Sequence, residues 1–210
     1  MKNVFRNLFQ VLFLSLMLVG CNDDITLKGT LSGTISNYSE GSFDGILCKE
    51  DVSHNIIGTG TPTSSGKFSI KLSMPYLNDL SSTPAGLVVS DKKAQIGSLS
   101  DIEIKLQGTI KGQLMKCNNI FDGYSTLKGM ELVTFMYSDR PCTITGYGSN
   151  GSISYTYDLK LKTGWNEVML MQESANKQTL TTKIAKDLEW RCFFFNASQN
   201  VKKYKVPAFN

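Results

Sequence analysis

Two stretches of this chain alternate strictly between apolar and polar positions. From Ile25 to Ser36 the odd positions are apolar or glycine, and the even positions are threonine, serine or lysine. From Asp101 to Leu114 the even positions are apolar or glycine, and the odd positions are polar or charged. A period of two places alternate side chains on opposite faces of a strand. Each stretch is therefore predicted to form one half-buried strand, with Asp101 and Glu103 on a solvated face.

Shorter segments of the same kind follow one another along most of the chain, separated by turns rich in Gly, Ser, Asn and Pro. The further strand candidates are Phe43–Lys49, Lys67–Leu72, Gly86–Ser90, Ala94–Leu99, Gly129–Ser138, Cys142–Gly148, Ser152–Leu161, Glu167–Met171, Leu180–Ile184 and Leu188–Phe195. Many short strands with regular turns are typical of antiparallel β-sandwiches. The predicted fold class is all-β.

One hairpin can be predicted in detail. Asn150-Gly151 stands between two alternating segments, and this dipeptide is the strongest sequence signal for a two-residue type I′ turn. Such a turn would place Cys142 opposite Leu159 on an apolar face, together with Tyr155. Tyr147 would then point outward, on the opposite face.

The two long alternating stretches also share a motif. Leu27–Ile35 and Leu106–Leu114 both fit Leu-x-Gly-Thr-(Leu/Ile)-x-Gly-x-(Ile/Leu). A shared opening strand indicates a repeat, although β-rich sequences reuse few residue types and coincidence is the alternative. Together with the length of the chain, the motif predicts two tandem sandwich domains, at residues 27–100 and 101–210.

The first twenty residues have the layout of an export signal. Lys2 and Arg6 precede an apolar run that is too short for a comfortable membrane span. The run ends in Leu18–Cys21, whose sequence Leu-Val-Gly-Cys resembles the lipobox of bacterial lipoprotein precursors. The resemblance implies that residues 1–20 are a cleaved signal peptide and that Cys21 is the lipid attachment site. Several acyl chains are needed for durable anchoring.

Residues 21–26 are interpreted as the lipidated cysteine and an acidic tether. Asp23 and Asp24 resemble the surface-export signals of some outer-membrane lipoproteins, and a short solvated tether is the alternative. The resemblance implies a protein that is lipid-anchored at the outer membrane, with the membrane as its first partner. Whether it faces the cell surface is left open.

Charge and cysteine content narrow the function classes. The formal net charge is +4, and it falls to +2 once Lys2 and Arg6 leave with the signal, which argues against a nucleic-acid partner. The cysteines after the lipobox are widely spaced, without a C-x-x-C pair that would suggest zinc or redox chemistry. We expect free, mostly buried thiols, with disulfides as the alternative in an oxidising compartment. These four cysteines are Cys48, Cys117, Cys142 and Cys192.

No residue pattern points to catalysis. His54 is the only histidine, and Ser53-His54 with Glu50 and Asp51 lacks the setting of a nucleophile elbow. We therefore predict a protein that is not an enzyme and has no cofactor or metal. Exposed aromatic rings are the remaining lead, because they can stack on the apolar faces of sugars. Tyr147 is the best candidate for such a ligand-binding residue, followed by Trp165.

Several segments resemble known groups of secreted proteins. Tyr137–Gly146 and Tyr157–Asn166 resemble a pattern in uncharacterised bacterial secreted lipoproteins. Ile57–Gly60, Ser65–Leu72 and the Met-Pro pair that follows are similar to the closing hairpin of transthyretin-like or carboxypeptidase-regulatory-like sandwiches. The resemblance implies Ig-like or transthyretin-like domains and no established activity. The leading hypothesis is a non-enzymatic interaction or structural accessory protein at the outer membrane, with an unidentified envelope protein or polysaccharide as its partner. A carbohydrate-binding surface module is the alternative, and a hydrolase is a distant third.

Overall fold

The computed structural model describes residues 29–80, 85–121 and 127–195, and these ranges contain strands and turns but no helix. No helix capable of crossing a membrane is found in them. The strands are β1 (Gly29–Thr34), β2 (Gly45–Glu50), β3 (Ile56–Gly60), β4 (Lys67–Leu72), β5 (Asn78–Asp79), β6 (Leu87–Val89), β7 (Gln95–Leu106), β8 (Thr109–Cys117), β9 (Glu131–Ser138), β10 (Cys142–Asn150), β11 (Ile153–Leu161), β12 (Gly164–Ser174), β13 (Lys177–Thr181) and β14 (Glu189–Phe194). The predicted all-β class is confirmed.

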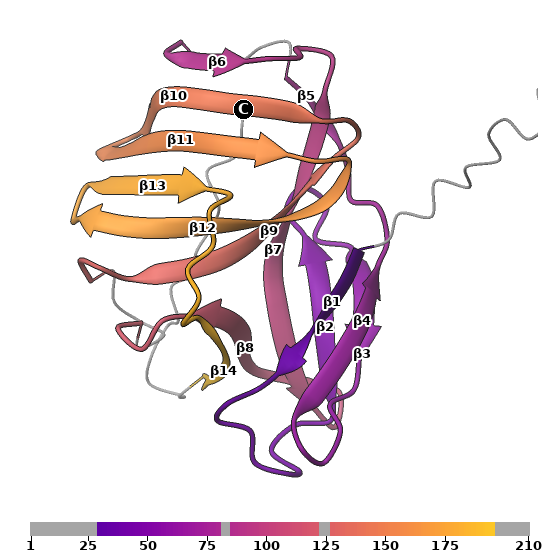
Figure 1. Cartoon of the computed structure of the whole chain (residues 1–210). Helices are drawn as coiled ribbons and strands as arrows, with labels where there is room; N and C mark the ends of the chain where they lie inside the picture. The colour runs from indigo at the N-terminus through magenta and orange to yellow at the C-terminus, as the bar shows by residue number, and fades with distance from the viewer. Residues whose placement is uncertain (1–28, 81–84, 122–126, 196–210) are drawn as a thin grey trace, which may run out of the picture.

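These strands form two sheets. β1 and β4 pair with each other, and the large sheet has the order β3-β2-β7-β8-β9-β12-β13-β11-β10-β6, with β14 on β8 and β5 on β7. Pairing is antiparallel except between β11 and β13 and at the bridge of Ile35 with Trp190. Figure 1 shows β6, β10, β11, β13 and β12 stacked at one end of the molecule, and the β1–β4 pair beside β2 and β3 at the other.

β7 connects these two ends. It pairs with β2, β5, β8 and β9, so hydrogen bonding continues across residues 100 and 101, where the domain boundary was expected. The predicted single strand from Asp101 to Leu114 is wrong, because the chain reverses at Gln107-Gly108. Both residues have positive φ, 50° and 78°, as a type I′ turn requires. Ile104 and Leu114 of the predicted apolar set are nevertheless buried.

The core consists of two main clusters on opposite faces of β9 and β12. Phe135 and Met169 belong to the first cluster, whereas their neighbours Met136 and Val168 belong to the second. Both faces of these central strands are therefore buried. A third, smaller cluster surrounds Phe121.

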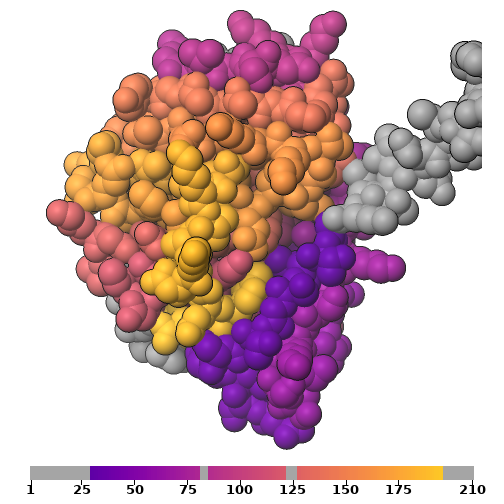
Figure 2. Space-filling model, in the orientation of Figure 1, coloured from indigo at the N-terminus to yellow at the C-terminus, as the bar shows by residue number. Residues whose placement is uncertain are grey.

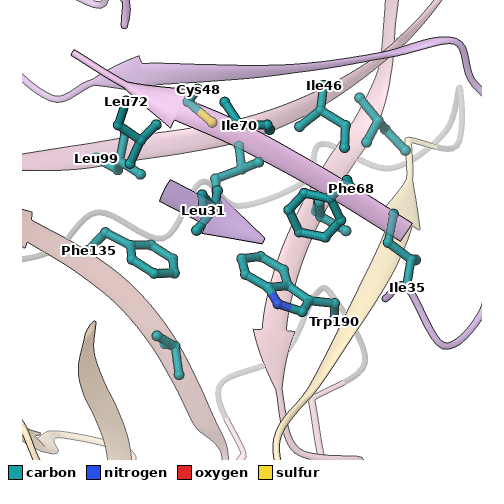
Figure 3. Close-up of a cluster of buried hydrophobic side chains, with 14 of the residues drawn as sticks. Leu31, Ile35, Ile46, Cys48, Phe68, Ile70, Leu72, Leu99, Phe135 and Trp190 are labelled. Atoms are coloured by element: carbon teal, nitrogen blue, oxygen red, sulfur yellow. The ribbon is translucent and has the colours of Figure 1, made fainter. Parts of the chain in front are cut away.

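Trp190 lies at the centre of the first cluster. Its ring stacks on Phe135 with 6.0 Å between centroids and meets Phe68 edge to face at 5.1 Å. Figure 3 shows these rings together with Leu31 and Ile35, the buried residues contributed by the β1 segment. The inward apolar set predicted for the first alternating stretch is confirmed from residue 29 onward, and residues 25–28 lie outside the described residues.

The hairpin of β10 and β11 has its predicted faces but not its predicted register. Asn150 pairs with Ile153, so Gly151-Ser152 forms the loop, and Cys142 lies opposite Leu161 rather than Leu159. Gly151 has a φ of 59°, which suits the first position of a type II′ turn. The pairing moves by two residues, an even number, and therefore leaves every side chain on its predicted face.

The solvated position predicted for two acids is wrong. Asp101 and Glu103 are only 7% and 4% exposed. Gln113 donates a hydrogen bond of 2.8 Å to Asp101, and Lys49 lies 2.6 Å from the Glu103 carboxylate. An amide on β8 and a cation on β2 therefore face these two buried carboxylates, as buried charges require.

Candidate functional site

The face of β10, β11 and β13 that lies opposite the second core cluster is open. Tyr147 on β10 is 71% exposed there, and Val88 on the neighbouring edge strand β6 is 67% exposed. Val88 lies opposite Thr145, which precedes Tyr147 by two residues on the same face of β10. In Figures 1 and 2 the segment after β13 crosses β12 and leaves β10 and β11 uncovered. The outward position predicted for Tyr147 is confirmed.

Rows of hydroxyl-bearing residues continue from Tyr147 across the sheet. Thr156 on β11 lies directly opposite Tyr147, and Thr179 on β13 lies next to Thr156. Registered partners share a face of the sheet. Tyr147 therefore has Val88 on one side and threonine side chains on the other, and we call this surface the Tyr147 face.

Two glycines position Tyr147 at the edge of the sheet. A Cβ at Gly146 would lie 2.1 Å from the carbonyl oxygen of Gly86, so only glycine allows β6 this close. Gly146 also has a φ of 121°, which disfavours any L side chain. The N–H of Tyr147 donates to the same Gly86 carbonyl at 3.0 Å. The backbone that carries the exposed ring is thus closely constrained.

Four charged side chains on the Tyr147 face form two ion pairs. Lys183 lies 2.8 Å from Asp158, and Lys177 lies 2.6 Å from Glu173. The hydrogen bond from Lys183 lowers the pKa of Asp158, and the hydrogen bond to Glu173 raises the pKa of Lys177. The two ion pairs therefore give the face fixed polar groups without a large net charge.

Trp165, the second predicted ligand-binding residue, lies at a cleft of about 190 Å³ between β1 and β12. Its ring meets Tyr137 edge to face at 5.7 Å and occupies the space that a side chain on Gly29 would fill. The cleft is lined by Gly29, Thr30, Leu31, Ser32, Leu72, Phe135, Trp165, Asn166 and Glu167.

The structure does not bring Tyr147 and Trp165 together. Tyr147 pairs with Thr156, Thr156 with Thr179, and Thr179 with Met171 of β12. Met171 is six residues from Trp165, which corresponds to about 20 Å along an extended strand. The two aromatic residues therefore belong to separate surfaces.

The polar residues around His54 have structural roles. Glu50 is 3% exposed, and its carboxylate accepts hydrogen bonds from Ser53 and from the N–H of Tyr76. His54 is exposed in the turn after β2 with a φ of 56°. Within the described ranges, no group of three His, Cys, Asp or Glu residues is placed to hold a metal ion.

The four cysteines after the lipobox are free and buried, which confirms the expected state. Burial raises the pKa of Cys48 and Cys192 to about 12. The pKa of Cys117 is also raised to about 12, chiefly by burial. Such thiols are packing groups rather than nucleophiles.

Comparison with known proteins adds no identification. No protein family, curated protein or solved structure matches the chain. Cys21 and its acidic tether lie outside the described residues, so the lipid anchor stays a prediction from sequence.

Sequence reasoning missed Val88 as the neighbour of Tyr147 and missed the cleft beside Trp165. Val88 belongs to a three-residue strand whose pairing with β10 spans more than fifty residues of chain. Thr30 and Ser32 are far from Trp165 in sequence, and only tertiary packing joins them. The one usable signal was Gly29, a glycine inside an otherwise regular strand, which indicates the close approach of another group.

Proposed function

We propose that this protein is a non-enzymatic, lipid-anchored binding protein of the outer membrane, and that its Tyr147 face contacts another envelope protein. The sequence Leu18–Cys21 supports the anchor. The binding role rests on one observation: Tyr147 and Val88, two large side chains, are exposed on adjacent strands of a constrained sheet.

The arrangement of the face suits protein recognition. Interface centres are enriched in tyrosine, and their rims are polar and solvated. Tyr147 and Val88 would form the centre, whereas the ion pairs of Asp158 with Lys183 and of Glu173 with Lys177 would belong to the rim. The constrained backbone at Tyr147 would lower the entropy lost on binding.

Carbohydrate binding is the second candidate for this face. The ring of Tyr147 lies beside Thr156 and Thr179, and an aromatic ring with adjacent hydroxyl groups can stack on a sugar and hydrogen bond to it. A single stacking contact contributes only about 1 kcal/mol. Several anchored copies that engage one polysaccharide would gain strength through multivalency.

Two substitutions separate these candidates. Tyr147→Ala should weaken binding in either case, but Val88→Ser should weaken a protein contact and leave sugar stacking intact. We would place a photo-cross-linking residue at Thr145 in intact cells and look for one specific protein adduct, with Thr59 on β3 as a remote exposed control. Affinity electrophoresis of the full-length protein in polysaccharide gels tests the second candidate.

The envelope-protein proposal expects a specific adduct at Thr145, none at Thr59, and loss of the adduct in both Tyr147→Ala and Val88→Ser. Retardation by a polysaccharide that only Tyr147→Ala abolishes would favour the carbohydrate role instead. Absence of both signals would rule out the Tyr147 face as a binding surface, and cleavage of any polysaccharide tested would contradict the non-enzymatic assignment.

A further inference from the structure

The cleft between β1 and β12 is the second place where aromatic and polar groups converge. It contains about 190 Å³ of space. A cavity of about 150 Å³ accommodates one benzene molecule. The cleft is therefore large enough for a single six-membered ring.

β1 contributes its edge to the cleft. The lining includes Thr30 and Ser32, which face outward, and Leu31, which faces the core. Side chains on opposite faces of a strand can line the same cavity only when that cavity lies along the edge of the strand. β1 pairs with β4 along its other edge, and alternate peptide groups of a strand point away from its partner. Backbone N–H and C=O groups are thus available beside the two hydroxyl groups.

β12 contributes an aromatic ring and a carboxylate. The Nε1 donor of Trp165 is buried and has no acceptor within the described part of the chain. Glu167 remains 39% exposed, while Lys116 holds its carboxylate with contacts of 2.8 and 3.0 Å. A buried donor without a partner is costly, and a bound group that accepts a hydrogen bond could remove this cost.

This set of groups favours a neutral polyhydroxylated ring. Sugar hydroxyls both donate and accept, which matches a wall of hydroxyl groups and peptide groups. The carboxylate of Glu167 can accept hydrogen bonds from sugar hydroxyls, whereas none of the residues that line the cleft is a cation that would hold an anionic ligand. We propose that the cleft formed by Thr30, Ser32, Trp165 and Glu167 binds one neutral sugar ring. This site is separate from the Tyr147 face and does not depend on the function proposed for it.

Indole N–H resonances provide a direct test. The chain has two tryptophans, and Trp165→Phe would assign the resonance of Trp165 in the full-length protein in detergent. The probes are the methyl glycosides of glucose, galactose, mannose, fucose and N-acetylglucosamine, with glucuronate as the anionic comparison. At least one neutral glycoside should shift the Trp165 resonance in a saturable manner, with glucuronate weaker and Trp190 unchanged.

The variants then identify the site. Glu167→Gln should weaken binding by about tenfold or more, the loss expected for a hydrogen bond to a charged group. Ser32→Ala should also weaken it, whereas Ser69→Ala on the paired strand β4, an exposed serine outside the cleft, should leave it unchanged. Tyr147→Ala should have no effect, so failure here is distinguishable from failure of the Tyr147 face.

The proposal is overturned if no neutral glycoside shifts the Trp165 resonance. It is also overturned if binding survives unchanged in Ser32→Ala and Glu167→Gln. Ser32 is an exposed side chain, so its replacement keeps the test valid even if loss of the Lys116–Glu167 pair disturbs folding.

Discussion

Gly33 provides the space that Trp190 occupies. A Cβ at position 33 would lie 2.3 Å from Cδ1 of the indole and 2.4 Å from Nε1. Gly29 has the same relationship to Trp165, with 2.0 Å to Cδ1. The two glycines of the first Leu-x-Gly-Thr motif are therefore places where tryptophans from β12 and β14 pack directly on the backbone of β1.

Gly33→Ala should accordingly destabilise the fold. The added methyl group must displace the buried indole, and overpacking of this kind costs about 1–3 kcal/mol. The free energy of unfolding, measured by urea denaturation, would report the loss. Gly148→Ala is the matched control, because its Cβ would meet Tyr157 at an ordinary 3.4 Å. Equal stability of the two variants would contradict the packing described here.

The buried thiols should resist alkylation. With a pKa of about 12 for Cys48, Cys117 and Cys192, only about one thiol in ten thousand is ionised near pH 8. In the Cys21→Ala variant, iodoacetamide should label none of the remaining cysteines while the protein is folded and all four in urea, as read by intact mass. Rapid labelling of the folded protein, or a disulfide in it, would refute this prediction.

Asp139 should make stability depend on pH in the acidic range. Burial alone would raise the pKa of Asp139, but hydrogen bonds from Arg140 and from the N–H of Gln95 outweigh it and lower the pKa below 3.8. A group with a lowered folded-state pKa stabilises the protein above its unfolded pKa and loses this effect as the pH falls through the folded value.

Asp139→Asn isolates this effect, since the amide oxygen can still accept from Gln95. The stability difference between the parent protein and this variant should stay constant from about pH 7 to about pH 5 and shrink below 3.8. Urea denaturation at several pH values measures it. A difference that does not change with pH would mean that the charge of Asp139 contributes nothing.

The predicted lipid anchor has a simple test. Cys21→Ala should abolish incorporation of labelled palmitate and leave an unprocessed precursor, because the thiol is the expected attachment point. Palmitate labelling in growing cells and the size of the protein on a gel are the measurements. Normal processing of the variant would exclude the lipoprotein assignment.

Periodicity predicted which side chains face inward, but not which strands are neighbours. A shared sequence motif does not give a shared structure in the segments Leu27–Ile35 and Leu106–Leu114. From residue 29 onward the first is an extended strand, whereas the second turns back at Gln107-Gly108. Alternation is a local property that both share, and the turn depends on the pairing of β7 with β8. The same limit explains the error at Asp101 and Glu103. Their alternation with apolar residues suggested a solvent-exposed face, but this face of β7 is buried.

The candidate site was predictable only in part. The alternation of side chains along the hairpin predicted that Tyr147 points outward. This prediction holds although the register was wrong, because the pairing moved by two residues. Val88 and the cleft beside Trp165 depend on contacts between distant segments, and no local pattern encodes them.

The contact between β1 and β14 also affects when the protein can fold. The N–H of Ser36 donates to the Trp190 carbonyl at 2.8 Å, and the Asn37 side chain hydrogen bonds to both backbone groups of Cys192. Because a chain is synthesised from its N-terminus, β1 is made long before its tryptophan exists. The first core must wait until Trp190 has been synthesised, and closing a contact over so long a stretch of chain slows folding. Until then Leu31 and Ile35 lack the Trp190 ring that packs in the same core cluster, so a truncation before β14 should produce an aggregation-prone protein.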